Sequence, residues 1–321
     1  MREKCIAIIT YCSYFNRHYI CFFFDYYKIY FFHRPRLQLE MNQSIGQYRV
    51  VNNEFASGGF GQIFEVRESN GWSRRLLLKT QTIQQFFLQE LQMLHIMKNE
   101  TGFNDLLDWF IIKNDNIDHF CMVIPCQGET FAHVLERSTA SPKNAVRIAY
   151  RLFTLIEKIH AIGYVHEDLH HQNLLFNMNA GFVQVILIDF GLCESLNPPP
   201  KERRMCASWQ SIYMCRSARY SVFDDLHSLV FLIMQCVGIT PFLTDNKEKF
   251  DKKSAFHANP YRYFPNQETT WIADLYTLIE NQRESGYHYN SLLDLLDEAI
   301  PGVDPSKPIE YQWQNDTFYI A

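Results

Sequence analysis

The chain has 321 residues, enough for two medium-sized lobes or domains. Hydrophobic residues make up 47% and charged residues 20%, which is ordinary for a globular protein, and the net charge of −5 argues against a protein that binds nucleic acid or a membrane over its whole surface. The nine cysteines include no C-x-x-C pair, so we expect reduced thiols and a cytoplasmic or nuclear location.

Residues 1–45 form an extension that is rich in aromatic residues, with the runs Phe22-Phe23-Phe24 and Phe31-Phe32. Polar and charged residues interrupt it, so no uncharged run reaches the roughly 20 residues that a membrane-spanning helix needs. We therefore expect a poorly ordered extension and no membrane insertion. Met41 is a natural start for the folded domain, and residues 1–40 should be dispensable for it.

A strand, a glycine-rich loop and a second strand follow. Tyr48–Val51 is strand-like, the loop comprises residues 56–61, and the alternation of Gln62–Val66 predicts the next strand. Glycines between strands let the backbone approach phosphates closely and leave its amides free to face them. Taken alone, such a run is more often a simple hairpin turn.

The apolar run 76–78 predicts a buried strand that ends at Lys79. Apolar residues at helical spacing in 83–97 predict a helix, and Glu90 lies among them. A lysine at the end of a strand is often only a solvated strand end. Because a carboxylate follows on the next element, we interpret Lys79 and Glu90 as an ion pair.

A strand at 120–124 precedes Pro125–Gly128, and residues 141–163 then read as a helix, with Ser141 as its cap and Pro142 in its first turn. This helix leads to a loop that carries Asp168 and, five residues further on, Asn173.

The apolar run 183–188 predicts a buried strand that delivers Asp189, and Phe190-Gly191 ends it. One carboxylate that takes the proton of a hydroxyl, with an amide and a second carboxylate that hold magnesium, suits phosphoryl transfer. A very apolar helix then begins at Asp224-Asp225.

Residues 46 to about 300 resemble a protein kinase, and within that superfamily the casein kinase I group, especially its tau-tubulin kinase-like branch. The narrower resemblance lies in 58–61, 122–128 and 224–229. It implies an α+β, bilobal protein-kinase-like fold. A small β-rich N-lobe with one main helix would span about 46–124, a hinge 125–128, and a larger α-helical C-lobe 129–321.

The resemblance also implies a site for ATP and Mg²⁺ between the lobes. Asp168 would be the base, Glu90 would orient Lys79 on the phosphates, and Asn173 and Asp189 would hold magnesium. In the hinge, the Pro125 carbonyl and the Gln127 amide would pair with adenine. The nucleotide-binding residues expected on this basis are Ala56, Ser57, Gly58, Gly59, Phe60, Gly61, Ile63, Lys79, Ile124 and Gln127.

Three positions depart from the family pattern. Glu167 stands where these kinases have an arginine that pairs with an anionic activation segment, which suggests that no activation-loop phosphate acts as a switch. His170 replaces a lysine that would contact the γ-phosphate. Cys206 replaces the threonine of a G-T-x-x-Y-x-S stretch, and a thiol is a poor hydrogen-bond partner for the loop that holds Asp168.

We expect a monomeric serine/threonine protein kinase with reduced activity. One alternative is a pseudokinase, which would bind nucleotide or partners with little turnover. The other is a small-molecule phosphotransferase, because His166-x-Asp168-x-His170-x-x-Asn173 also resembles the catalytic loop of aminoglycoside- and choline-type phosphotransferases.

The segment from Pro198 to Tyr220 is basic, which favours acidic or pre-phosphorylated protein substrates and no nucleic acid. Its basic residues, against the single acid Glu202, are Lys201, Arg203, Arg204, Arg216 and Arg219. A solvated basic face explains the same composition equally well.

Overall fold

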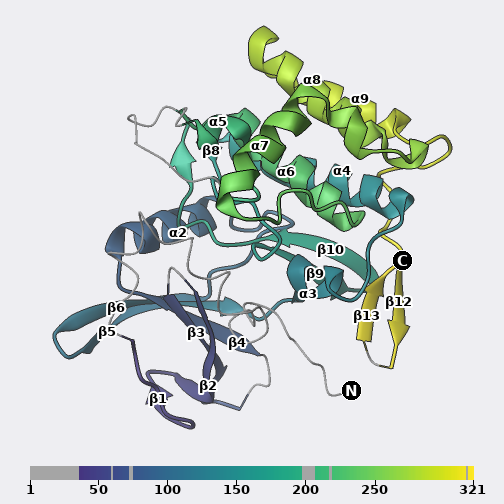
Figure 1. Cartoon of the computed structure of the whole chain (residues 1–321). Helices are drawn as coiled ribbons and strands as arrows, with labels where there is room; N and C mark the ends of the chain where they lie inside the picture. Colours follow the sequence, from purple (N-terminus) through teal and green to yellow (C-terminus); the bar gives the residue numbers. More distant parts are fainter. Residues whose placement is uncertain (1–35, 59–60, 72–74, 197–206, 217–218, 316) are drawn as a thin grey trace. The chain divides into compact units, whose positions relative to one another are not determined.

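A computed structural model describes residues 36–58, 61–71, 75–196, 207–216, 219–315 and 317–321. The chain divides into two compact units, whose elements are labelled in Figure 1. Of the described residues, the first unit contains those up to Glu129 together with Ile186–Cys193, and the second contains those of Thr130–Val185 and Glu194–Ala321. Among the described residues, a sheet and one helix make up the first unit and helices dominate the second, which confirms the predicted α+β fold with a β-rich and a helical lobe.

The first unit is built on a six-stranded antiparallel sheet with the order β1-β2-β3-β4-β6-β5. Its elements are β1 (Ser44–Ile45), β2 (Tyr48–Gly58), β3 (Gly61–Glu68), β4 (Leu76–Gln81), α2 (Gln84–Ile96), β5 (Asp108–Asn114) and β6 (Ile117–Pro125). Ile63 pairs with Lys79, and Leu77 pairs with Ile124. Since paired residues share a face and side chains alternate along a strand, Ile63, Lys79 and Ile124 lie on one face of the sheet.

An apolar core closes the opposite face. Its buried members are Leu37, Leu39, Tyr48, Val50, Phe64, Val66, Leu76, Leu78, Cys121 and Val123. The alternation that places Leu76 and Leu78 in this core leaves Lys79 and Gln81 on the face where Glu90 of α2 contacts them.

The predicted extension ended at residue 45, but residues 36–45 belong to the first unit. Leu37 and Leu39 are only 3% and 7% exposed. The Leu37 N–H donates to Gln62 Oε1 at 2.7 Å, and Gln62 Nε2 donates to the Leu37 carbonyl at 3.2 Å. Two leucines at strand spacing therefore complete the core. Residues 1–35 lie outside the described residues, so the rest of that prediction stays a prediction.

Helices form most of the second unit. They are α3 (Phe131–Leu135), α4 (Pro142–Ala161), α5 (Ile212–Cys215), α6 (Val222–Cys236), α7 (Asn246–Ala258), α8 (Trp271–Ser285) and α9 (Tyr289–Glu298), with short η2 (Pro260–Tyr263) and η3 (Gln267–Thr269). The strands that follow β6 are β7 (Glu129–Thr130), β8 (Tyr164–Val165), β9 (Leu174–Asn179), β10 (Phe182–Leu187), β11 (Glu194–Ser195), β12 (Tyr311–Gln314) and β13 (Thr317–Ile320).

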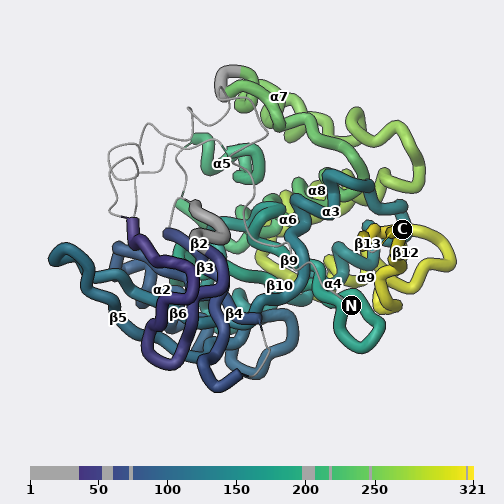
Figure 2. The backbone as a smooth tube through the Cα atoms, turned by 90° about the horizontal axis from the view of Figure 1, so that it is seen from below, coloured from purple at the N-terminus to yellow at the C-terminus, as the bar shows by residue number. Residues whose placement is uncertain are grey.

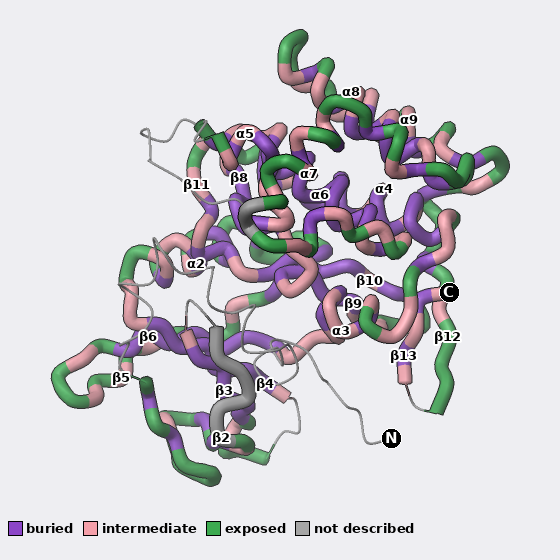
Figure 3. The backbone as a smooth tube through the Cα atoms, in the orientation of Figure 1, coloured by how far each residue is buried: buried purple, intermediate pink, exposed green. Residues whose placement is uncertain are grey.

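Helix α6 is the centre of this unit. It packs against α4 and α8, as the backbone trace shows (Figure 2), and is buried along most of its length (Figure 3). Ser221 and Asp224 form a capping box at its start, while Ser141 caps α4 through a 3.4 Å hydrogen bond from the Asn144 N–H. The predicted cap of the α4 helix is therefore confirmed.

Residues 186–193, which the sequence analysis included in the larger lobe, pack with the first unit. The Leu187 N–H donates to the Gly102 carbonyl at 2.9 Å, and the ring of Phe190 lies 6.0 Å from that of Phe103. Asp189 is therefore placed by the sheet-containing unit.

In the described part of the chain, no helix is both long enough and apolar enough to cross a membrane. Cys215 is disulfide-bonded, so the expectation that all the cysteines are reduced was wrong.

Leu37→Ala should lower the free energy of unfolding by about 2–4 kcal/mol, because it leaves a cavity in the core. Leu88→Ala is the matched control, since Leu88 is 49% exposed on α2. Urea unfolding of both variants checks this. A chain that begins at Met41 should likewise be less stable than one that begins at Arg36, and equal stabilities would contradict the role given to the two leucines.

Candidate functional site

Lys79 lies at the centre of a buried ion cluster in the first unit. Its Nζ donates to both carboxylate oxygens of Glu90 at 2.7 Å and to Asp189 Oδ1 at 3.0 Å. Burial alone would lower the pKa of Lys79, but the charges of Asp189 and Glu90 outweigh that effect and raise it. The ammonium group is therefore charged at neutral pH, and it lies where a strand, a helix and the segment after β10 meet.

Gln81 joins this cluster, a contact that the sequence analysis missed. Its Nε2 donates to Glu90 Oε2 at 3.0 Å, and the side chain is buried. Glu90 thus has one donor that does not depend on Lys79. The signal was present in the sequence, because residues two apart on a strand point the same way.

The glycine-rich loop joins β2 and β3. Ala56, Ser57 and Gly58 pair with Ile63, Gln62 and Gly61. A Cβ on Gly61 would lie 1.8 Å from the Thr80 carbonyl oxygen, so this position requires glycine for the close approach of β3 to β4. Gly59 and Phe60 lie outside the described residues.

The other predicted nucleotide-binding positions lie on or near the same sheet. Ile63 and Ile124 are buried on the face that carries Lys79. Pro125 ends β6, and the Cys126 N–H donates to the Arg75 carbonyl at 3.2 Å. Gln127 follows and is half-buried.

In the second unit, Asp168 and Asn173 form a hydrogen-bonded pair. Asn173 Nδ2 donates to the Asp168 carbonyl at 2.9 Å and to Asp168 Oδ2 at 3.1 Å. The Asp168 N–H donates to His166 Nδ1 at 3.3 Å. A carboxylate and an amide of the loop between β8 and β9, called the catalytic loop below, are thereby fixed relative to each other.

Asp225 of α6 holds the catalytic loop through hydrogen bonds to its backbone. Its carboxylate accepts the N–H groups of His166 and Glu167 at 2.8 and 3.0 Å. Glu167 has a φ of 68°, in the left-handed region that is costly for this residue type, and the bond from its N–H helps to hold it there. Asp189 also has a left-handed backbone, with a φ of 65°. Left-handed residues therefore occur next to one predicted site residue, Asp168, and at another, Asp189.

Two further contacts complete the surroundings of Asp225. His160 Nε2 lies 3.0 Å from Oδ2, and the Tyr220 hydroxyl donates to Oδ1 at 2.6 Å. Burial would raise the pKa of Asp225, but the hydrogen bond and charge of His160 outweigh that effect and lower it. Asp225 is therefore an ionised acceptor at neutral pH.

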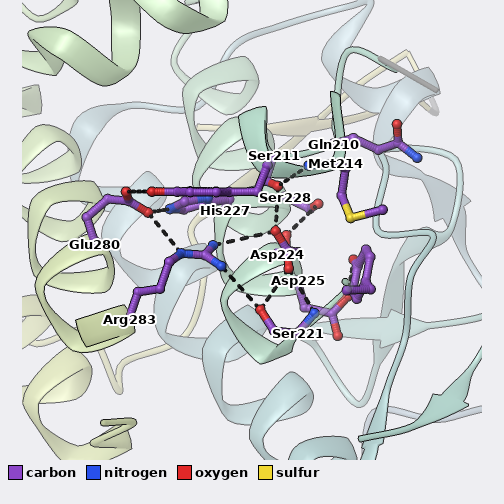
Figure 4. Close-up of polar contacts among 12 residues, drawn as sticks. Gln210, Ser211, Met214, Ser221, Asp224, Asp225, His227, Ser228, Glu280 and Arg283 are labelled. Carbon is purple, nitrogen blue, oxygen red and sulfur yellow. Dashed lines mark hydrogen bonds and ion pairs between the residues drawn. The ribbon is translucent and has the colours of Figure 1, made fainter. Parts of the chain in front are cut away.

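A second polar cluster links the start of α6 to α8 (Figure 4). Asp224 accepts from the Ser211 hydroxyl at 2.5 Å and pairs with Arg283 at 3.5 Å. Glu280 Oε1 lies 2.8 Å from His227 Nε2, and the Tyr213 hydroxyl donates to Glu280 Oε2 at 2.6 Å. These bonds anchor the segment that follows residue 206 to the core of the second unit.

Residues 50–298 match the family model described as a protein kinase domain, which is well over half of the chain. The chain belongs to the protein kinase family. In this kinase, Lys79 and Glu90 precede the catalytic loop along the chain and Asp189 follows it, which is the order that the family resemblance implied.

Named relatives of this kinase are distant. A Caenorhabditis elegans protein provisionally named casein kinase I is 26% identical over 215 residues, 58% of this chain and 59% of the relative. Serine/threonine-protein kinase VRK1 of that organism is 25% identical over 238 residues, 65% of this chain and 38% of VRK1. A Dictyostelium discoideum protein provisionally named a myosin light chain kinase is 25% identical over 228 residues, 67% of this chain and 65% of the relative. The matched part spans less than two thirds of each relative.

The kinase fold thus brings the predicted residues together in two groups, each inside one unit. Lys79, Glu90 and Asp189 meet in the first, and Asp168 and Asn173 meet in the second. Besides Gln81, the sequence analysis missed His160 and Tyr220. No local pattern marks them, because they reach Asp225 from different elements.

Glu280→Gln should lower the stability of the kinase at pH 7 by about 1–2 kcal/mol, allowing for partial solvent screening. Burial would raise the pKa of Glu280, but the hydrogen bond from His227 and the contacts with Tyr213 and Arg283 lower it from 4.5 to about 2. Because the folded-state pKa is depressed, the stabilisation is complete above about pH 4.5 and is lost as the pH falls toward 2.

Urea unfolding of the wild type and the variant at pH 7 and pH 3 measures this effect, and the difference between them should shrink at pH 3. Glu284→Gln is the matched control, because Glu284 is exposed on the same helix. The same difference at both pH values would show that Glu280 contributes no ionic stabilisation.

Proposed function

We propose that this kinase is a serine/threonine protein kinase, which transfers the γ-phosphoryl group of ATP to protein hydroxyl groups. The observation that carries the proposal is the catalytic loop, in which Asn173 bonds both the carbonyl and the carboxylate of a nearly buried Asp168. Phosphoryl transfer depends chiefly on the positioning of the reacting groups and on electrostatic stabilisation. The Asp168–Asn173 pair supplies the positioning.

Each residue then has a defined task. Asp168 accepts the proton of the attacking hydroxyl. Lys79 binds the phosphates, and Glu90 keeps it in place. Because Lys79 also pairs with Asp189 at 3.0 Å, nucleotide binding must exchange that ion pair for contacts with phosphate oxygens. Gln81 keeps a donor on Glu90 while this exchange takes place.

Asn173 and Asp189 suit magnesium, which prefers amide and carboxylate oxygens and fills its other positions with water and phosphate. Asn173 Nδ2 is engaged by Asp168, so its amide oxygen is the ligand atom. When bound, the metal neutralises charge on the phosphate oxygens. Within the family we place the kinase in the casein kinase I group, tau-tubulin kinase-like branch. The similarity to the C. elegans protein supports the group.

Wild-type kinase should transfer labelled phosphate from magnesium-ATP to serine or threonine of a generic acidic protein. Asp168→Asn should lower the rate by about 10²- to 10⁴-fold, because the general base is lost. Asp297→Asn, at an exposed position of α9, is the matched control and should have no effect. Phosphoamino-acid analysis identifies the acceptor residue.

Equal rates for the wild type and Asp168→Asn would overturn the enzyme assignment and leave a pseudokinase. Phosphate transfer to an aminoglycoside or choline, with none to protein, would favour a small-molecule phosphotransferase.

We further propose acidic or pre-phosphorylated protein segments as substrates. Arg216 and Arg219 are exposed, and the Arg216 guanidinium lies 5.6 Å from the centre of the Phe250 ring. Lys201, Arg203 and Arg204 lie outside the described residues, so the basic composition of the sequence is the support for their part in the proposal.

Replacing Arg216 and Arg219 together by glutamine should raise KM for an acidic peptide by about 3- to 10-fold, as expected for two partly screened charge pairs. Lys113→Gln, at a side chain that is 81% exposed on β5, is the control. A wild-type preference for basic over acidic flanks would contradict the proposal.

A further inference from the structure

Trp209 contacts the catalytic loop through His170, a contact that the roles given above do not use. The two rings lie 4.6 Å apart between centroids, with their planes at 50°. Both residues belong to the second unit. The sequence analysis expected His170 to face the γ-phosphate in place of a lysine, whereas in this structure the imidazole is directed back toward its own loop.

The ring nitrogens of His170 define this orientation. Nδ1 accepts the N–H of Gln172 at 3.2 Å. Nε2 lies 3.4 Å from Asp168 Oδ2 and 3.2 Å from Asn173 Nδ2. Since Nδ1 accepts a hydrogen bond from the backbone of its own loop, Nε2 is the ring nitrogen that approaches the Asp168–Asn173 pair. His170 therefore contacts both members of the Asp168–Asn173 pair.

Trp209 is in turn held by two helices. The Ser228 hydroxyl of α6 donates to the Trp209 carbonyl at 2.7 Å. Lys253 of α7 is buried and donates to the carbonyls of Ala207 and Gln210, which flank the tryptophan. The Ala207 N–H donates to the side chain of Gln210 at 3.0 Å, which closes the turn. Burial lowers the pKa of Lys253 well below its usual value, and its amino group, which lies near the rings of Phe231 and Phe242, fixes this turn through the two carbonyls.

We propose that Trp209 and His170 are positioning residues for the catalytic base. The indole packs on the imidazole, and the imidazole holds the Asp168 carboxylate in the orientation that accepts the substrate proton. This inference rests on the proposed kinase activity and deepens it. It also gives the loop a support that does not need the threonine replaced by Cys206, a residue outside the described ranges.

Steady-state kinetics with magnesium-ATP and an acidic protein substrate test the proposal in the full chain. Trp209→Ala should lower kcat by about 10- to 100-fold, the scale of a small displacement of a catalytic group, with KM for ATP within twofold of wild type. Trp209→Phe keeps an aromatic ring on His170 and should retain most of the activity. Trp313→Ala, at an exposed tryptophan of β12, is the matched control and should have no effect.

A double-mutant cycle separates positioning from general support of the fold. If Trp209 acts through His170, Trp209→Ala should add little to the kcat loss of His170→Ala. Additive losses, or a Trp209→Ala variant as active as wild type, would overturn the inference and leave the kinase assignment intact.

If Trp209→Ala does not fold, His170→Ala alone decides, because an unchanged kcat in that variant would also overturn the inference. If the wild-type rate equalled that of Asp168→Asn, the proposed kinase activity would be overturned, and the inference would fail with it.

Discussion

The buried carboxylate of Asp225 is the acceptor on which the catalytic loop depends. It is contacted by two backbone N–H groups, one imidazole and one phenol, which come from α4, from the loop and from the segment before α6. A buried carboxylate is costly unless it is fully hydrogen-bonded, and here the bonds that satisfy it are also the bonds that shape the loop. The position of Asp168 in the loop therefore depends on the packing that buries Asp225.

In the first unit the buried group is a cation, Lys79, which lies between two carboxylates. Lys79 pairs with both Glu90 and Asp189, and burial raises the pKa of Glu90 while the charge of Lys79 opposes that effect. Under the proposed function, magnesium would bind beside Asp189 and add positive charge to this cluster. Gln81 adds a neutral donor to Glu90, which under the proposed function would keep that carboxylate hydrogen-bonded while Lys79 contacts phosphate.

The sequence predicted these two centres because each is marked by short motifs in a fixed order. Lys79 follows an apolar run, although β4 continues to Gln81, while Glu90 comes next on a helix and the spacing from Asp168 to Asn173 is local. Leu37 could not be recognised in the same way, since its burial depends on the distant Gln62. Trp209 was missed for a similar reason: its contact with His170 depends on where α6 and α7 hold the turn.

Glu167 shows how the departures from the family pattern act together. Under the proposed function, the negative charge of Glu167 would not attract an anionic activation segment as an arginine would, so we expect no ordering of the loop by phosphorylation through this residue. The orientation of Asp168 would then be set by contacts that do not require phosphorylation. The bonds from Asp225 to the Glu167 backbone and the packing of Trp209 on His170 are of that kind. Under the proposed function, such a kinase has its base in position without a phosphate switch, and its rate follows the packing of the second unit.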